Sequence, residues 1–173
     1  MKDWTALLEE AIPSPCFDRP FVCDGFPSAS NLMVIGENPA TSINKDWWLF
    51  WNPETGFDYE AFLAVYREKK ETNRGVRPRF QHIRKMGVKC IETNVYRNEK
   101  QDSAGHGETN TDLLQLLIDN NENLKAIILH GDEAQSFSDR LTLPKWVNLY
   151  KTRHFRTEGF DEIDRICTDS KIV

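Results

Sequence analysis

Three polar segments of the chain hold side chains that are suited to binding or converting a ligand. Gly36-Glu37-Asn38-Pro39 combines a glycine, which lets backbone approach a ligand, with a proline that holds its neighbours in place. Asn94 carries an amide with two donor hydrogens and an acceptor oxygen, which can match the edge of a nucleobase. His154 is flanked by Arg153 and Arg156. Each segment alone also fits a plainer role: a strand-to-loop turn, a turn-forming asparagine and an exposed loop histidine.

Apolar runs before these segments predict the strands of a parallel sheet. The runs lie at 31–36, 88–94, 125–130 and 147–150, and helical patterns lie at 2–12, 58–72, 78–86, 111–120, 132–140 and 160–167. Strands that alternate with helices predict right-handed crossovers and helices on both faces of the sheet. We therefore expect an α/β fold, a three-layer α/β/α sandwich with a four-stranded parallel sheet, in one domain over residues 1–173. Ligands of such sheets bind at the C-terminal ends of the strands, where the polar segments lie.

The charge of the chain is unevenly distributed. The net charge of the chain is −5. Residues 67–85, however, contain eight basic residues and two glutamates, so this segment has a net charge of +6. A solvated helix face explains such a run more often than a phosphate-binding surface does, but a local patch is enough for a protein that contacts few phosphates. No apolar run approaches the roughly 20 residues that span a membrane, and the first residues do not form a secretory signal. We expect a cytoplasmic monomer without membrane contact.

The four cysteines, Cys16, Cys23, Cys90 and Cys167, are expected to be thiols in a reducing cytosol. No Cys-x-x-Cys pair occurs, and Cys90 falls inside a predicted buried strand. We therefore expect no zinc, no iron–sulfur cluster and no other cofactor. His130 is expected at the buried end of the strand over 125–130.

The order of the polar motifs carries more information than any one of them. Gly36-Glu37-Asn38-Pro39 comes first, Thr93-Asn94-Val95 second, then Leu124–Ala134 with a strand, a glycine and a helix, and finally His154-Phe155-Arg156. This order resembles the uracil-DNA glycosylase superfamily, in which Gly-x-(Asp/Asn/Ala)-Pro opens the site and a loop containing histidine closes it. The resemblance covers roughly residues 31–160. The closing motif of that family is usually His-Pro-Ser, so the chain departs from it there.

The resemblance implies hydrolysis of the bond between deoxyribose and uracil, or a related damaged or mismatched base, in DNA, as in base-excision repair. The base must first leave the stack. His154 would then stabilise the departing base as an anion. Glu37 could accept a proton from the attacking water, whereas Asn38 could only orient that water. Asn94 would pair with the polar edge of uracil.

The remaining residues of the expected site bind the substrate. Gly36 and Pro39 belong to the opening motif, and Arg153 and Arg156 are expected to contact DNA. Phe50, in the aromatic run over 47–51, is the candidate ring for stacking on the base, because family members carry such a ring about a dozen residues after the first motif. Aromatic residues in a short loop usually fill the core, so at most one or two of this run are expected to touch substrate.

Two other functions remain open on sequence grounds. The same fold could serve as a nucleic-acid or protein-binding module with weak or no catalysis, because Asn38 stands in place of an aspartate and the closing motif is altered. A hydrolase acting on free nucleosides is the third possibility, although the chain has no Gly-x-x-x-x-Gly-Lys phosphate loop.

Overall fold

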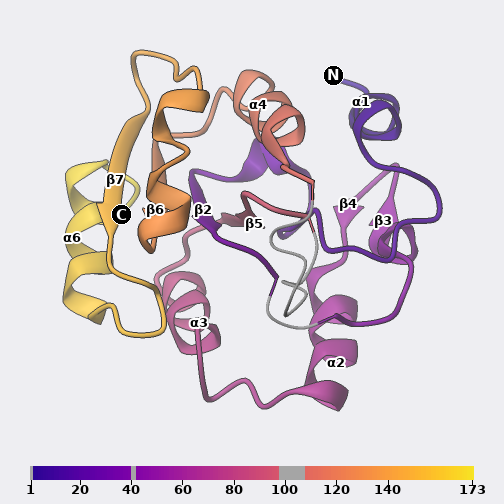
Figure 1. The fold of residues 1–173 in the computed structure, drawn as a ribbon, viewed down its shortest axis with the longest axis horizontal. Coiled ribbons are helices and arrows are strands. Elements are labelled where there is room, and N and C mark those ends of the chain that lie inside the picture. The colour runs from indigo at the N-terminus through magenta and orange to yellow at the C-terminus, as the bar shows by residue number, and fades with distance from the viewer. Residues whose placement is uncertain (1, 40–41, 98–107) are drawn as a thin grey trace.

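The computed structural model describes residues 2–39, 42–97 and 108–173 of the chain (Figure 1). The helices are α1 (Trp4–Ala11), α2 (Tyr59–Lys69), α3 (Arg77–Lys85), α4 (Thr111–Asp119), α5 (Asp132–Gln135) and α6 (Phe160–Asp169). The strands are β1 (Phe21–Val22), β2 (Leu32–Gly36), β3 (Trp51–Asn52), β4 (Gly56–Phe57), β5 (Cys90–Asn94), β6 (Ala126–His130) and β7 (Asn148–Thr152). Three short 3₁₀ helices are η1 (Pro27–Ala29), η2 (Trp47–Phe50) and η3 (Ser138–Arg140).

The central sheet has five strands in the order β1-β5-β2-β6-β7. The four strands predicted from the sequence are confirmed, and β5, β2, β6 and β7 run parallel to one another. The prediction of a four-stranded sheet is wrong in its number, because β1 adds an antiparallel edge beside β5. β1 has only two residues inside a proline-containing loop, too few for a period-two pattern to show. β3 and β4 form a separate hairpin.

Helices cover both faces of this sheet, as the α/β prediction requires (Figure 1). Alternate side chains of β2 point to opposite faces, as those of any strand do. Leu32 and Val34 belong to the cluster that contains buried residues of α3 and α6. Met33 and Ile35 belong to the cluster that contains buried residues of α1, α2 and α4. All five residues of β2 are buried, as is typical of a central parallel strand.

Two helices end several residues before the position that the sequence predicted. α2 ends at Lys69 rather than at residue 72, because Lys70 is already extended. The helix expected over 132–140 is divided into α5 and η3, and the serines and aspartate after Gln135 favour turns over helix interiors. Among the residues described, none of the helices combines the length and apolar character needed to cross a membrane.

Candidate functional site

A cavity of about 440 Å³ lies at the C-terminal edge of the sheet, on the face that α3 covers. Its volume is within the range that is typical of small-ligand pockets. Residues from all three polar segments line this one cavity: Glu37, Asn38, Asn94, His154 and Arg156. The structure therefore brings together the candidate residues on which the sequence hypothesis depends.

Asn94, Gly36 and His130 form a row across the ends of three adjacent strands. β5 pairs with β2 so that Asn94 lies beside Gly36, and β6 pairs with the other side of β2, which places His130 next in the row. A Cβ atom on Gly36 would lie 2.6 Å from His130 Nε2 and 3.0 Å from Asn94 Oδ1. Only glycine leaves room for both side chains to converge above β2.

His130 ends β6, is 7% exposed as a residue and lines the cavity. Its Nδ1 accepts a hydrogen bond from the backbone N–H of Phe155 at 3.3 Å, so the proton of the neutral ring is on Nε2. Burial, together with the nearby His154, lowers the pKa of His130 to about 3. The imidazole is therefore neutral at physiological pH. Among the described residues, none forms a hydrogen bond with its Nε2.

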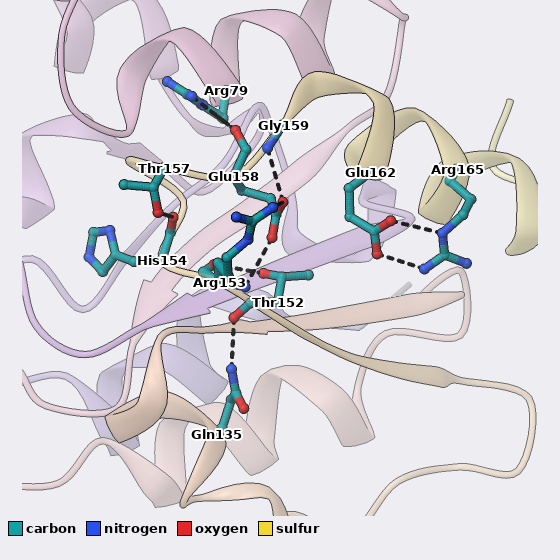
Figure 2. A network of polar contacts seen from close by, with 10 residues as sticks. All are labelled: Arg79, Gln135, Thr152, Arg153, His154, Thr157, Glu158, Gly159, Glu162 and Arg165. Carbon is teal, nitrogen blue, oxygen red and sulfur yellow. Dashed lines mark hydrogen bonds and ion pairs between the residues drawn. The ribbon is translucent and has the colours of Figure 1, made fainter.

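The loop after β7 carries His154, and a buried glutamate holds this loop in shape (Figure 2). Glu158 is 4% exposed, and its carboxylate accepts hydrogen bonds from the backbone N–H groups of Arg153 and Gly159, both at 2.9 Å. Arg79 of α3 donates twice to the Glu158 carbonyl, at 3.0 and 2.9 Å. Figure 2 shows the His154 ring directed away from these contacts. Glu158 therefore fixes the backbone and leaves the imidazole available to the cavity.

The His154 ring is exposed and stands close to the buried histidine. The ring centroids of His154 and His130 are 4.9 Å apart at an angle of 88°. His154 Nδ1 accepts from the backbone N–H of Arg156 at 3.1 Å, so its neutral form also carries the proton on Nε2. Phe155 is fully buried between His130, on which it stacks at 4.9 Å, and Phe80 at 5.5 Å. The middle residue of the closing motif is thus part of the core.

A buried ion pair forms another part of the cavity lining. Arg77 of α3 pairs with both carboxylate oxygens of Glu92 in β5, and the Tyr59 hydroxyl donates to Glu92 Oε1 at 2.7 Å. Burial alone would lower the pKa of Arg77, but attraction to Glu92 outweighs it and raises this pKa. Burial and the same carboxylate raise the pKa of Tyr59. Arg77, Glu92 and Tyr59 therefore form one buried, hydrogen-bonded unit at the sheet.

Further basic side chains line the cavity. Lys70 and Arg74 come from the connection between α2 and α3, and Arg19 and Arg156 come from other loops. Once Arg77 and Glu92 are taken as a pair, Glu37 is the remaining carboxylate among the described lining residues. The basic stretch over 67–85 thus contributes to the cavity in a chain whose net charge is −5.

Phe50 lies elsewhere than the sequence suggested. It is 6% exposed and packs in the aromatic core, 5.9 Å from Phe57 and 6.0 Å from Phe62. It does not line the cavity, so the structure does not bring this ring together with the other predicted site residues. The aromatic side chains in the lining are Tyr66 of α2 and Phe80 of α3.

Three other predicted residues do not line the cavity. The space above Gly36 is filled by His130 and Asn94, not by an open pocket. Pro39 is buried at the end of the opening motif. The Arg153 side chain is 79% exposed and lies 3.8 Å from Glu158, so Arg156 is the arginine of the closing segment that reaches the cavity.

Sequence reasoning missed His130, the aromatic lining and the buried ion pair as parts of the site. The prediction that His130 ends a buried strand is confirmed. The rule that ligands bind at C-terminal strand ends applied to this residue as well, and could have identified it. Glu92 also gave a signal, because a carboxylate inside an otherwise apolar strand must find a partner when it is buried.

The described residues do not include a cluster of side chains that could bind a metal ion. Within residues 2–39, 42–97 and 108–173, no group of three or more His, Cys, Asp or Glu side chains is arranged to hold a metal ion. The four cysteines are buried free thiols, and burial raises the pKa values of Cys23 and Cys90.

Comparison with known proteins does not assign the chain to a family. No protein-family model matches it, and no curated protein sequence matches it significantly. The motifs and the geometry of the cavity are therefore the features that point to a function.

The neutral state of His130 makes the fold sensitive to acid. The folded pKa of about 3 lies below the ordinary value of 6.5, so between these pH values the unfolded chain binds a proton that the folded chain does not. We expect stability to fall as the pH drops through this window, by up to about 1.4 kcal/mol per unit from His130. Urea unfolding at pH 7, 6, 5 and 4 measures this slope. The His130→Asn variant has no titrating group at this position and should show a shallower slope of stability against pH. Equal slopes in the two proteins would contradict the conclusion that His130 causes the loss of stability.

Proposed function

We propose that the protein is a DNA glycosylase that hydrolyses the bond between deoxyribose and uracil or a related damaged base. The observation that carries this proposal is the convergence of Glu37, Asn38, Asn94 and His154 on one cavity. These residues lie far apart in the chain and follow three different strands, as the motifs of the uracil-DNA glycosylase superfamily do.

The cavity has the features that a single extruded base requires. It lies at the C-terminal edge of a mostly parallel sheet, where α/β proteins bind ligands. Tyr66 and Phe80 supply aromatic surface, and a ring that stacks on a base contributes about 1–3 kcal/mol. Asn94 supplies an amide that can pair with the polar edge of the base.

The lining residues can also support the reaction. Water attacks the sugar carbon, the bond to the base breaks, and its electron pair leaves with the base. Glu37 is the carboxylate that can accept the proton of the water, and Asn38 can orient it. His154 presents an Nε2–H that can stabilise the negative charge on the departing base. Protonation of the base by solvent completes the reaction.

The basic side chains supply a means of holding DNA. Lys70, Arg74 and Arg156 lie around the cavity, where the phosphates next to an extruded nucleotide would pass. Phe155, by contrast, is fully buried and cannot insert between base pairs. The charge distribution therefore supports contacts to a few phosphates rather than extensive binding of a duplex.

We expect the protein to release base from uracil-containing single- or double-stranded oligonucleotides, which alkali then cleaves at the abasic site. His154→Ala should lower the rate roughly a hundredfold, because one donor to the departing base is lost. Lys145→Gln is the matched control, since Lys145 is exposed before β7, at the opposite end of that strand from His154. Absence of abasic sites with every deaminated or mismatched base tested would refute the glycosylase assignment.

A catalytically weak binding module is the second candidate. Asn38 favours it, because an amide next to Pro39 cannot accept a proton from water. Oligonucleotide binding that survives both Asn38→Ala and His154→Ala, without base release by the wild type, would support this alternative over the glycosylase.

A further inference from the structure

The buried His130 presents a hydrogen-bond donor that the motif comparison does not account for. Its Nδ1 is occupied by the Phe155 N–H, and its ring lies at a wall of the cavity. We propose that His130 selects the base, because its Nε2–H donates to a ring carbonyl and so favours carbonyl-bearing bases over bases with an amino group at that place. This inference rests on the proposed function and adds a specificity residue to it.

Two packing contacts and one hydrogen bond fix the orientation of the His130 ring and of its Nε2–H. Phe155 stacks on the ring at 4.9 Å with an interplanar angle of 19°. The ring also packs closely on β2, since a Cβ atom on Gly36 would lie 2.6 Å from Nε2. Turning the ring over would remove the acceptor from the Phe155 N–H and leave that buried group unpaired, which costs about 1–3 kcal/mol.

The donor is also fixed in its chemistry. A neutral imidazole with its proton on Nε2 cannot accept a hydrogen bond at that atom. The amide of Asn94 differs, because rotation by 180° exchanges its donor and acceptor groups. His130 therefore discriminates bases more reliably than Asn94 can alone.

Deamination changes the group that this donor would meet. Uracil presents a carbonyl oxygen where cytosine presents an amino group, and hypoxanthine differs from adenine in the same way. A base with an amino group would place a donor against the Nε2–H and leave both unpaired in a buried site. We expect such bases to be released at least about a hundredfold more slowly.

Two substitutions separate this role from a structural one. In His130→Gln the side-chain N–H can occupy the place of Nε2, whereas in His130→Asn the carbonyl can occupy the place of Nδ1 and the donor is lost. With a single-stranded uracil oligonucleotide, we expect His130→Gln to retain activity within about tenfold and His130→Asn to lose at least about a hundredfold. A role limited to accepting from Phe155 predicts the opposite order, and that order would overturn the inference.

A second measurement uses the wild-type protein and does not depend on catalysis. In ¹⁵N-detected histidine spectra, free uracil should shift the Nε2–H resonance of His130, and free cytosine should not. Base release by the wild type together with an unchanged His130 resonance in saturating uracil would overturn the role of His130 and leave the glycosylase assignment intact. A protein that neither releases base nor binds uracil would overturn both.

Discussion

Arg77→Met is expected to lower the free energy of unfolding by about 3–5 kcal/mol, the largest stability effect that the structure predicts. Arg77 is 3% exposed, and its removal leaves the Glu92 carboxylate buried without its counter-charge. Urea or thermal unfolding measures the loss. The double variant Arg77→Met/Glu92→Gln should recover most of it, because no charge remains buried and the glutamine can still accept from Tyr59.

An exposed ion pair provides the control for this prediction. Arg165 pairs with Glu162 on the surface of α6, with both side chains more than one third exposed. Arg165→Met should change stability far less than Arg77→Met, because solvent screens the pair in the folded protein. Equal effects of the two substitutions, or no recovery in the double variant, would contradict the importance of burial.

Gly36→Ala is expected to lower activity as strongly as His130→Asn, although Gly36 has no side chain that could contact the base. The new methyl group would lie 2.6 Å from His130 Nε2 and 3.0 Å from Asn94 Oδ1, so both side chains must move. We expect base release to fall by at least about a hundredfold, and stability to fall by about 1–3 kcal/mol from overpacking. Oligonucleotide cleavage and urea unfolding measure the two effects separately.

Gly159→Ala is the matched control for Gly36→Ala. Gly159 precedes α6 with an ordinary φ of −73°, and no atom lies within 4 Å of a Cβ at this position. The Gly159→Ala variant should therefore release base at the wild-type rate. Full activity in Gly36→Ala would show that the close approach of His130 and Asn94 is not needed for base release.

The fold could be predicted where apolar side chains formed long enough patterns. The runs that became β2, β5 and β6 are buried strands bounded by glycine or polar residues. The run that became β7 is a more exposed strand at the edge of the sheet. β1 could not be predicted, because two residues between prolines show no periodicity. The β3–β4 hairpin could not be predicted for a similar reason, because each of its strands has only two residues.

The candidate site could be predicted only in part, because strand ends indicate location but not side-chain direction. The sequence placed Asn38, Asn94 and His154 at one edge of the sheet, and the structure gathers them there. The row of Asn94, Gly36 and His130 depends on the register between strands, which one sequence does not determine. Phe50 and Phe80 are both aromatic, and only packing decides that the second faces the cavity.

The contact between Phe155 and His130 constrains how the closing segment could be exchanged. Proline has no backbone N–H, so a transplanted His-Pro-Ser loop would take away the donor that holds His130 Nδ1. It would also remove the aromatic surface on which the imidazole lies. A chimera that keeps His130 but replaces Phe155 would therefore lose the contacts that orient the imidazole. The residues at positions 130 and 155 should be exchanged together.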